Sequence, residues 1–208
     1  MKKIVPLLIT VTFLTMNVCL VNAETNSATP GVERDVTYGR RSLGSSLFLL
    51  GNLAPGDPPY YFLLNYGHQL TPNDIIFAEA ITWTYYEPLG TYGASDKHYP
   101  GKIRAYGVGA GYQRFLLKNV YITVQAIPFH QQFFNTAGNA IQSGIQLYLQ
   151  SRLGYHFEFL RQRWFLEPSV AFNYWPVNTH FPDAFKEVES GKPNYFLFEP
   201  GLHFGYKF

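Results

Sequence analysis

The stretch that decides the fold is residues 143–157, which read SGIQLYLQSRLGYHF. Apolar and polar side chains alternate along it. One face carries Ile145, Leu147, Leu149, Ser151, Leu153, Tyr155 and Phe157, and the other carries Gln146, Tyr148, Gln150, Arg152, Gly154 and His156. A period of two residues is typical of a β-strand whose faces meet different environments. Strands of soluble proteins average about 5–6 residues, whereas a tilted membrane-spanning strand needs about 9–11. The stretch is therefore long enough to cross a membrane.

Seven further strand-like segments lie between residues rich in turn formers, at 41–53, 59–70, 74–86, 102–116, 119–132, 163–175 and 194–208. The alternation is clear in the last two and weak in the first and third. In the last segment it predicts that Phe196, Phe198, Pro200, Leu202, Phe204, Tyr206 and Phe208 face outward, and that Tyr195, Leu197, Glu199, Gly201, His203, Gly205 and Lys207 face inward. In the third segment, Glu79 faces inward if its neighbours Ala78 and Ala80 face outward. Residues 41–208 are therefore predicted to be all-β, as an eight-stranded antiparallel up-and-down transmembrane β-barrel.

A barrel whose strands each have one apolar face can be built in two ways. In a soluble, lipocalin-like barrel the apolar face points inward and the polar face meets water. Here the polar faces hold mainly Gly, Ala, Gln, Asn and Tyr with few charges, which favours the filled interior of a transmembrane barrel. The connections agree, because short turns alternate with longer loops, as in bacterial outer-membrane barrels. The short turns are 71–73, 117–118 and 158–162, and the longer loops are 52–58, 87–101, 133–142 and 176–193.

Composition and the N-terminal sequence indicate the cellular location of the chain. Aromatic residues make up 18%, charged residues 14%, and the net charge is +2. These values exclude a disordered chain and give no basis for a nucleic-acid partner. Residues 1–23 are predicted to be a signal peptide cleaved near Ala23, because Lys2 and Lys3 precede an apolar stretch that ends in small residues. Residues 24–40 are predicted to be a flexible lead-in, and we expect the mature chain in a bacterial outer membrane.

Six polar side chains that can ionise fall on the predicted interior face: Glu79, Arg152, His156, Glu167, Glu199 and His203. The interior of an eight-stranded barrel is just filled by side chains, so one interpretation is an ion-paired network that plugs the lumen. The other is a proton-linked or hydrolytic site, because a carboxylate beside a histidine can perform acid–base chemistry. Ser169, His156 and Glu167 are the nearest catalytic candidates, although no Gly-x-Ser-x-Gly motif accompanies them. The dipeptides Glu167-Pro168 and Glu199-Pro200 predict bulges, because proline lacks a backbone donor.

The last eight residues, GLHFGYKF, place aromatic side chains at alternate positions before a terminal phenylalanine. This ending resembles the signal by which bacterial outer-membrane barrels are recognised by their assembly machinery. The resemblance gives that role to Phe204, Tyr206 and Phe208, with His203 standing where the usual pattern has glycine. Residues 79–83 and 196–202 also resemble a family of uncharacterised eight-stranded outer-membrane barrel proteins. The resemblance implies a fold and a location but no activity.

The leading functional hypothesis is a small outer-membrane barrel with a plugged polar lumen and a structural or surface-interaction role without catalysis. The alternative is a lipid-modifying enzyme that uses the interior Glu/Arg/His cluster. A narrow pore or a carrier for a small apolar ligand is a further alternative. Expected partners are outer-membrane lipid, lipopolysaccharide and the barrel assembly machinery. The mixed-charge loop 176–193, which contains Phe181 and Phe185, is a candidate contact for an external partner. No cofactor and no metal is expected.

Overall fold

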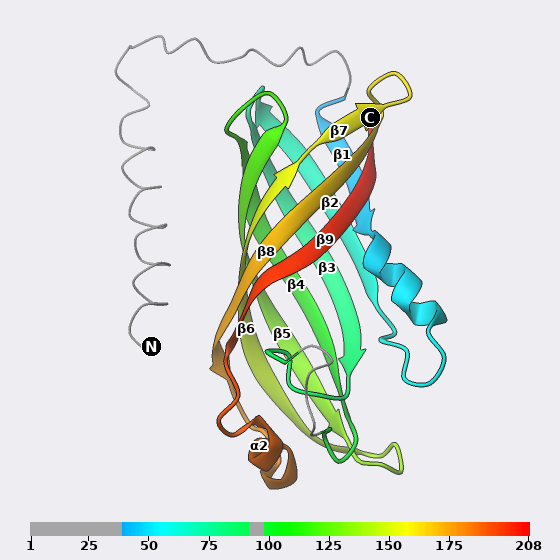
Figure 1. The fold of residues 1–208 in the computed structure, drawn as a ribbon, viewed down its shortest axis with the longest axis vertical. Helices are drawn as coiled ribbons and strands as arrows, with labels where there is room; N and C mark the ends of the chain where they lie inside the picture. Colours follow the sequence, from blue (N-terminus) through cyan, green and yellow to red (C-terminus); the bar gives the residue numbers. More distant parts are fainter. Residues whose placement is uncertain (1–38, 92–97) are drawn as a thin grey trace. The chain divides into compact units, whose positions relative to one another are not determined.

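The structure, a computed structural model, describes residues 39–91 and 98–208. The predicted signal peptide 1–23 and residues 24–38 of the predicted lead-in lie outside the described residues. The described part is mostly antiparallel β-sheet (Figure 1). Its nine strands are β1 (Arg41–Ser46), β2 (Phe62–Thr71), β3 (Asp74–Tyr85), β4 (Lys102–Phe115), β5 (Val120–Phe134), β6 (Ala140–Tyr155), β7 (Phe157–Phe159), β8 (Trp164–Asn178) and β9 (Tyr195–Lys207). Two short helices join them, η2 (Leu47–Leu53) and α2 (Asp183–Glu189).

The sheet closes on itself into a ring. Each strand from β1 to β5 pairs with the next, β1 also pairs with β9, and β8 pairs with β9, β7 and β6. The sixth predicted segment is present as two strands in one register, because Gly154 faces Ser169 and Phe157 faces Leu166. Only His156 separates these two strands. Its backbone N–H donates to the carbonyl of Asn119 (2.8 Å), the residue just before β5. The predicted all-β class is confirmed.

The two ends of the ring differ in their connections (Figure 1). At the short-turn end, which also carries the C-terminus, residues 72–73, 116–119 and 160–163 join the strands. At the long-loop end, β5 and β6 extend further than expected, so the predicted loop 133–142 shrinks to residues 135–139. The predicted loop 176–193 is also corrected, because β8 continues to Asn178 and helix α2 follows.

The first predicted segment is wrong in its second half. β1 ends at Ser46, and a 3-10 helix replaces the expected strand over Leu47–Leu53. The sequence LFLLGNL has four consecutive apolar residues, so it lacks the alternation of a strand. The Ser46 hydroxyl also caps the helix by accepting from the Phe48 N–H (3.2 Å). Among the described residues, therefore, no strand fills the space between β9 and β2 on the long-loop side of Ser46.

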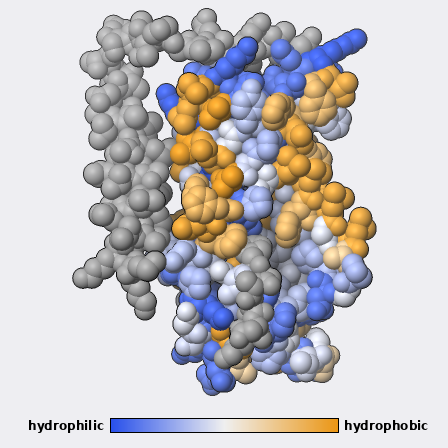
Figure 2. Space-filling view, in the orientation of Figure 1, coloured by the Kyte–Doolittle hydropathy of each residue, from blue (hydrophilic) through white to orange (hydrophobic). Residues whose placement is uncertain are grey.

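The inward and outward faces follow the predicted alternation along most of the ring. Residues such as Val108, Ile145, Leu153 and Val170 are exposed on the outside, whereas Gln146, Arg152, Glu167 and Asn173 on the predicted polar faces are buried, and Glu199 and His203 are partly buried. Figure 2 shows hydrophobic side chains gathered on the visible surface nearer the short-turn end, with hydrophilic ones toward the long-loop end. The interior holds two kinds of core, a polar one near the short turns and an aromatic one near the long loops.

A bulge in β9 corrects the predicted faces of its first residues. Ala171 pairs with Glu199, but Phe172 pairs with Leu197, which leaves Phe198 as an extra residue with φ +64°. An extra residue reverses the faces of the strand before it. Leu197 is therefore exposed and Phe196 packs against the interior core, the opposite of the prediction; Tyr195, paired with the outward Tyr174, is likewise reversed.

The two predicted proline bulges have different outcomes. The bulge in β9 lies next to the Glu199-Pro200 dipeptide, on its N-terminal side. At Glu167-Pro168 the prediction is wrong, since Glu167 and Pro168 pair in continuous register with His203 and Leu202. The pairing of β8 with β9 therefore continues through Pro168 without an extra residue.

Candidate functional site

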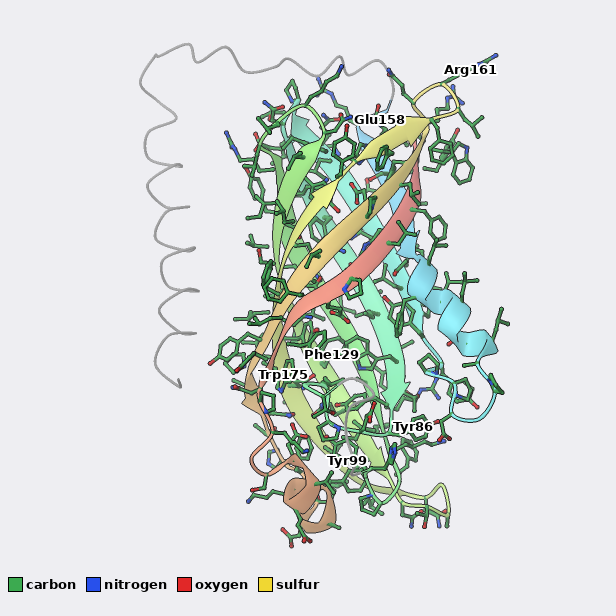
Figure 3. All side chains as sticks on the ribbon, in the orientation of Figure 1. Tyr86, Tyr99, Phe129, Glu158, Arg161 and Trp175 are labelled. Atoms are coloured by element: carbon green, nitrogen blue, oxygen red, sulfur yellow. The ribbon has the colours of Figure 1, made fainter. Side chains whose placement is uncertain are left out.

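The lumen near the short-turn end contains a cavity of about 310 Å³. Turn residues Lys118, Asn119 and Gln162 line it, so it reaches that end of the ring. Deeper in the lumen its lining includes His156, Glu158, Glu167, Arg152, His203 and Lys207. We call this cavity the vestibule. Figure 3 labels Glu158 at the same end of the ring.

His156 is the centre of an ion-pair chain in the vestibule. Its Nδ1 lies 2.7 Å from Glu167 Oε1 and its Nε2 lies 2.9 Å from Glu158 Oε1. The Lys207 ammonium lies 2.5 Å from the same Glu158 oxygen. Two ionised carboxylate acceptors require a proton on each ring nitrogen, which is the imidazolium form. Two cations then face two carboxylates, so the chain is balanced in charge.

Aromatic rings hold the imidazole of His156 in place. The Phe165 ring is stacked on it at 5.1 Å between centroids, and the Phe115 ring meets it edge-on at 5.4 Å. Gln113 completes the site by donating to Glu167 Oε1 (3.2 Å). His156 is thus buried, stacked and hydrogen-bonded through both nitrogens, an arrangement that fixes its position.

Arg152 forms a second polar layer, further from the short turns. Its guanidinium lies 2.6 Å from His203 Nε2 and donates to Thr123 Oγ1 (3.3 Å) and Gln125 Oε1 (3.4 Å). Gln125 in turn donates to Glu79 Oε1 (3.3 Å). Gln125 therefore connects Arg152 to the buried carboxylate of Glu79.

The remaining interior carboxylates are bound by amides. Glu79 also accepts from the Asn65 amide (3.3 Å), so its carboxylate is held between Asn65 of β2 and Gln125 of β5. Glu199 accepts from the Asn173 amide (2.5 Å), whose oxygen accepts from Gln150 (2.7 Å). All six predicted interior side chains therefore take part in hydrogen bonds inside the ring.

An aromatic layer fills the lumen beyond the polar layers. It consists of Tyr61, Leu63, Ile81, Ala105, Ile127, Phe129, Tyr148 and Trp175. Figure 3 shows Phe129 and Trp175 inside the ring, on the long-loop side of its middle. Tyr148 and Trp175 are stacked at 5.9 Å, and Trp83 stacks on Phe129 at 5.5 Å.

A second aromatic cluster closes the long-loop end. Phe185 of α2 is buried against Tyr99, Ile103 and Phe133. The Tyr99 hydroxyl also hydrogen-bonds Glu189 at the end of the same helix. Burial raises the pKa of Glu189 above its ordinary value, more than the hydrogen bond from Tyr99 lowers it. Helix α2 is therefore docked on the ring by Phe185 and Glu189.

The catalytic candidates are only partly brought together. His156 and Glu167 are in contact, but both nitrogens of His156 face carboxylates, which leaves neither to accept a proton from a serine. Ser169 Oγ is buried and makes no hydrogen bond to either residue among the described contacts. The predicted Ser169–His156–Glu167 set is therefore not assembled as a nucleophile, base and orienting acid.

Sequence reasoning missed Glu158 as an interior residue by placing it in the turn 158–162. The signal was available, because Glu158 follows His156 by two residues and so lies on the same face of a continuing strand. Lys207 was predicted to face inward, and the structure brings it to Glu158.

The predicted assembly-signal residues lie on the last strand. Phe204 and Tyr206 are partly exposed, and Tyr206 meets Trp164 edge-on at 5.1 Å. Phe208 exchanges backbone hydrogen bonds with Arg41 (2.9 and 3.2 Å), which joins the last residue to β1. These contacts close the ring at the short-turn end.

Comparisons with protein-family models, with curated proteins and with solved structures found no match for this chain. The resemblance to uncharacterised outer-membrane barrels therefore stays a prediction. Within residues 39–91 and 98–208, no group of three or more His, Cys, Asp or Glu side chains could hold a metal ion. The helices in this part of the chain are all too short or too polar to span a membrane.

Proposed function

We propose that this chain is a small transmembrane β-barrel of a bacterial outer membrane, with a plugged lumen and a structural or surface-interaction role without catalysis. The observation that supports it best is the distribution of side chains between the two faces of the ring. Charged residues such as Glu79, Arg152 and Glu167 are buried inside, whereas Val108, Ile145 and Val170 are exposed outside. A soluble protein would bury the second set and expose the first.

Strand β4 supports a membrane location by its length. Its outward residues between Arg104 and Arg114 are Tyr106, Val108, Ala110 and Tyr112. The stretch bounded by the two arginines matches the roughly 9–11 residues of a tilted membrane-spanning strand. Arg104 lies over the Tyr106 ring (5.2 Å), and Arg114 pairs with Asp74 (3.0 Å). Charges paired with aromatic or acidic neighbours at both ends of an apolar band are what a bilayer interface favours.

The filling of the lumen favours a structural role over a pore or an enzyme. From the short turns to the long loops it holds the His156 ion-pair chain, the Arg152 layer, the aromatic layer and the Phe185 cluster. Both nitrogens of His156 face carboxylates, and Ser169 Oγ has no hydrogen-bond partner among the described residues, so the arrangement favours a structural role for this cluster over lipid modification.

The long-loop end would carry surface interactions. Helix α2 turns Phe185 inward, so the aromatic contact that the sequence suggested for loop 176–193 is used within the chain. The exposed residues of the helix are mainly charged, with Asp183, Lys186 and Glu187. A partner at this end, such as the phosphate and sugar groups of lipopolysaccharide, would therefore meet a polar surface.

Site-specific labelling in intact bacteria tests both location and orientation. In a Cys19→Ser background, Ser190→Cys places a thiol at the long-loop end and Lys118→Cys places one in a short turn; both positions are exposed. A maleimide that cannot cross membranes should label Ser190→Cys in intact cells and Lys118→Cys only after lysis. Equal labelling of both in intact cells, or of neither, would contradict the proposal.

A further inference from the structure

A gap interrupts the wall of the ring where β1 ends. β1 pairs with β9 only as far as Ser46 and His203, and with β2 only as far as Gly44 and Asn65. Beyond that point no strand of the described residues pairs with residues 195–202 of β9 on this side. Ser46 Oγ donates to the Leu202 carbonyl (3.5 Å), and Ser45 Oγ donates to the Leu63 carbonyl (2.7 Å). These two hydroxyls satisfy the first free carbonyl on each side of the gap.

A second cavity, of about 70 Å³, lies inside the ring at this gap. By the measure of 10–15 Å³ for a single water, it has room for roughly five to seven waters. Its lining includes Phe48 of η2 and Pro200 of β9, which are exposed on the outside, together with the interior residues Leu63, Ile81 and Tyr148. A cavity lined by both outward-facing and inward-facing residues opens through the wall rather than along the axis.

The rim of the gap is apolar on its η2 and β9 sides. Phe48, Leu50 and Leu53 of η2 are exposed, Leu53 by 80%. Leu197 and Phe198 are exposed on the β9 side, Phe198 by 68% because the bulge turns it outward. Unpaired strand edges are tolerated in a membrane only where protein or a cavity covers them. An exposed apolar rim around such an edge is suited to hydrocarbon.

The cavity combines an apolar wall with polar groups at its inner side. The aromatic layer contributes Tyr61, Phe129 and Tyr148, and the inner side is formed by Glu79, Arg152, Glu199 and His203. Trp83 also lines it, and its indole N–H is buried without a hydrogen-bond acceptor among the described residues. Buried donors normally have partners, so an unpaired one beside a cavity indicates a missing acceptor.

From these observations we infer that part of the acyl chain of a membrane lipid enters the lumen sideways through the gap between η2 and β9. The acyl chain packs against the part of the aromatic layer that lines the cavity, Tyr61, Phe129 and Tyr148, and an oxygen of the lipid, such as an ester carbonyl, lies within reach of the Trp83 N–H. The inference rests on the proposed membrane location. It adds a binding site to a barrel that is otherwise plugged, and it requires no covalent step.

Tryptophan quenching by brominated lipid tests the inference with the full chain. The sequence has three tryptophans, and they differ usefully: Trp164 is 40% exposed, Trp175 is 2% exposed in the aromatic layer, and Trp83 lines the cavity. Each would be kept as the single tryptophan while the other two are replaced by phenylalanine. Each variant is then reconstituted into phosphatidylcholine vesicles with and without bromine on the acyl chains.

We expect the bromine to quench Trp164 and Trp83 strongly and to leave most of the emission of Trp175. A Leu63→Phe substitution that fills the cavity should restore the emission of Trp83, and Ile81→Phe is a second filling variant if the first does not fold. Quenching of Trp164 with Trp83 no more quenched than Trp175 would overturn sideways entry and leave the membrane location standing. Failure to quench Trp164 would overturn the membrane location, and the inference with it.

Discussion

Replacing His156 with alanine tests whether the ion-pair chain in the vestibule is structural. The substitution removes contacts of 2.7 Å to Glu167 and 2.9 Å to Glu158, and leaves both carboxylates without their shared cation. Hydrogen bonds to charged groups contribute about 1.5–3 kcal/mol each, and breaking a buried pair costs about 3–5 kcal/mol. Glu158 is partly exposed and keeps Lys207, so most of the cost comes from Glu167. We expect a loss of about 4 kcal/mol in the free energy of unfolding.

Urea unfolding of the protein in vesicles, followed by tryptophan fluorescence, measures this loss. His130→Ala is the matched control, because His130 is exposed on the outside of β5. Its effect should stay within about 0.5 kcal/mol. The double variant His156→Ala/Glu167→Gln should recover part of the stability, since the amide needs no counter-charge. If His156→Ala is as stable as the wild type, or if the double variant is worse than the single one, the ion-pair chain is not what stabilises this end.

Further predictions concern other parts of the ring. Burial raises the pKa of Glu189, so its neutral form favours docking of α2. This stabilisation is fully present below the ordinary value of 4.5 and is lost as pH rises through the higher folded value. Proteolysis within the loop that carries α2 should therefore speed up over that range, and Glu189→Gln should remove the dependence. Gly111→Ala would press a methyl group into the Phe77 ring, so we expect a loss of about 1–3 kcal/mol in urea unfolding; unchanged stability would mean that the interior is not tightly packed there. In planar bilayers the wild type should show no steady conductance, whereas Trp175→Ala with Tyr148→Ala should produce openings, because these stacked rings fill the lumen. Stable channels from the wild type would show that the lumen is not plugged.

The strands could be predicted because their faces meet consistent environments. In β8 every second residue from Phe165 to Trp175 is buried, and β6 alternates in the same way at Gly144, Gln146, Tyr148 and Arg152. The alternation in the sequence therefore predicted both the strands and the inward direction of Arg152, His156 and Glu167. The six side chains predicted on the interior face lie inside the ring for the same reason. Their pairing was not predictable, because which carboxylate meets which cation depends on the register and tilt of the strands around the ring.

The errors arise where local geometry departs from alternation. Pro200 indicated a bulge in β9 but not its exact position, and the extra residue at Phe198 therefore reversed the predicted faces of Tyr195–Leu197. The early end of β1 depends on the cap at Ser46 and on contacts of η2 with distant residues. Helix α2 is stabilised by Phe185 against Tyr99 and Phe133, partners that are far away in the sequence.

The central claim is that a closed ring of strands sits in an outer membrane, and electrophoresis of the outer-membrane fraction tests it most directly. The fraction is run in mild detergent with and without boiling, because a closed barrel stays folded in the detergent until it is heated. We expect the protein in this fraction, with a clear difference in mobility between unheated and heated samples. Recovery of the protein in the soluble periplasm, with one mobility under both conditions, would contradict the account.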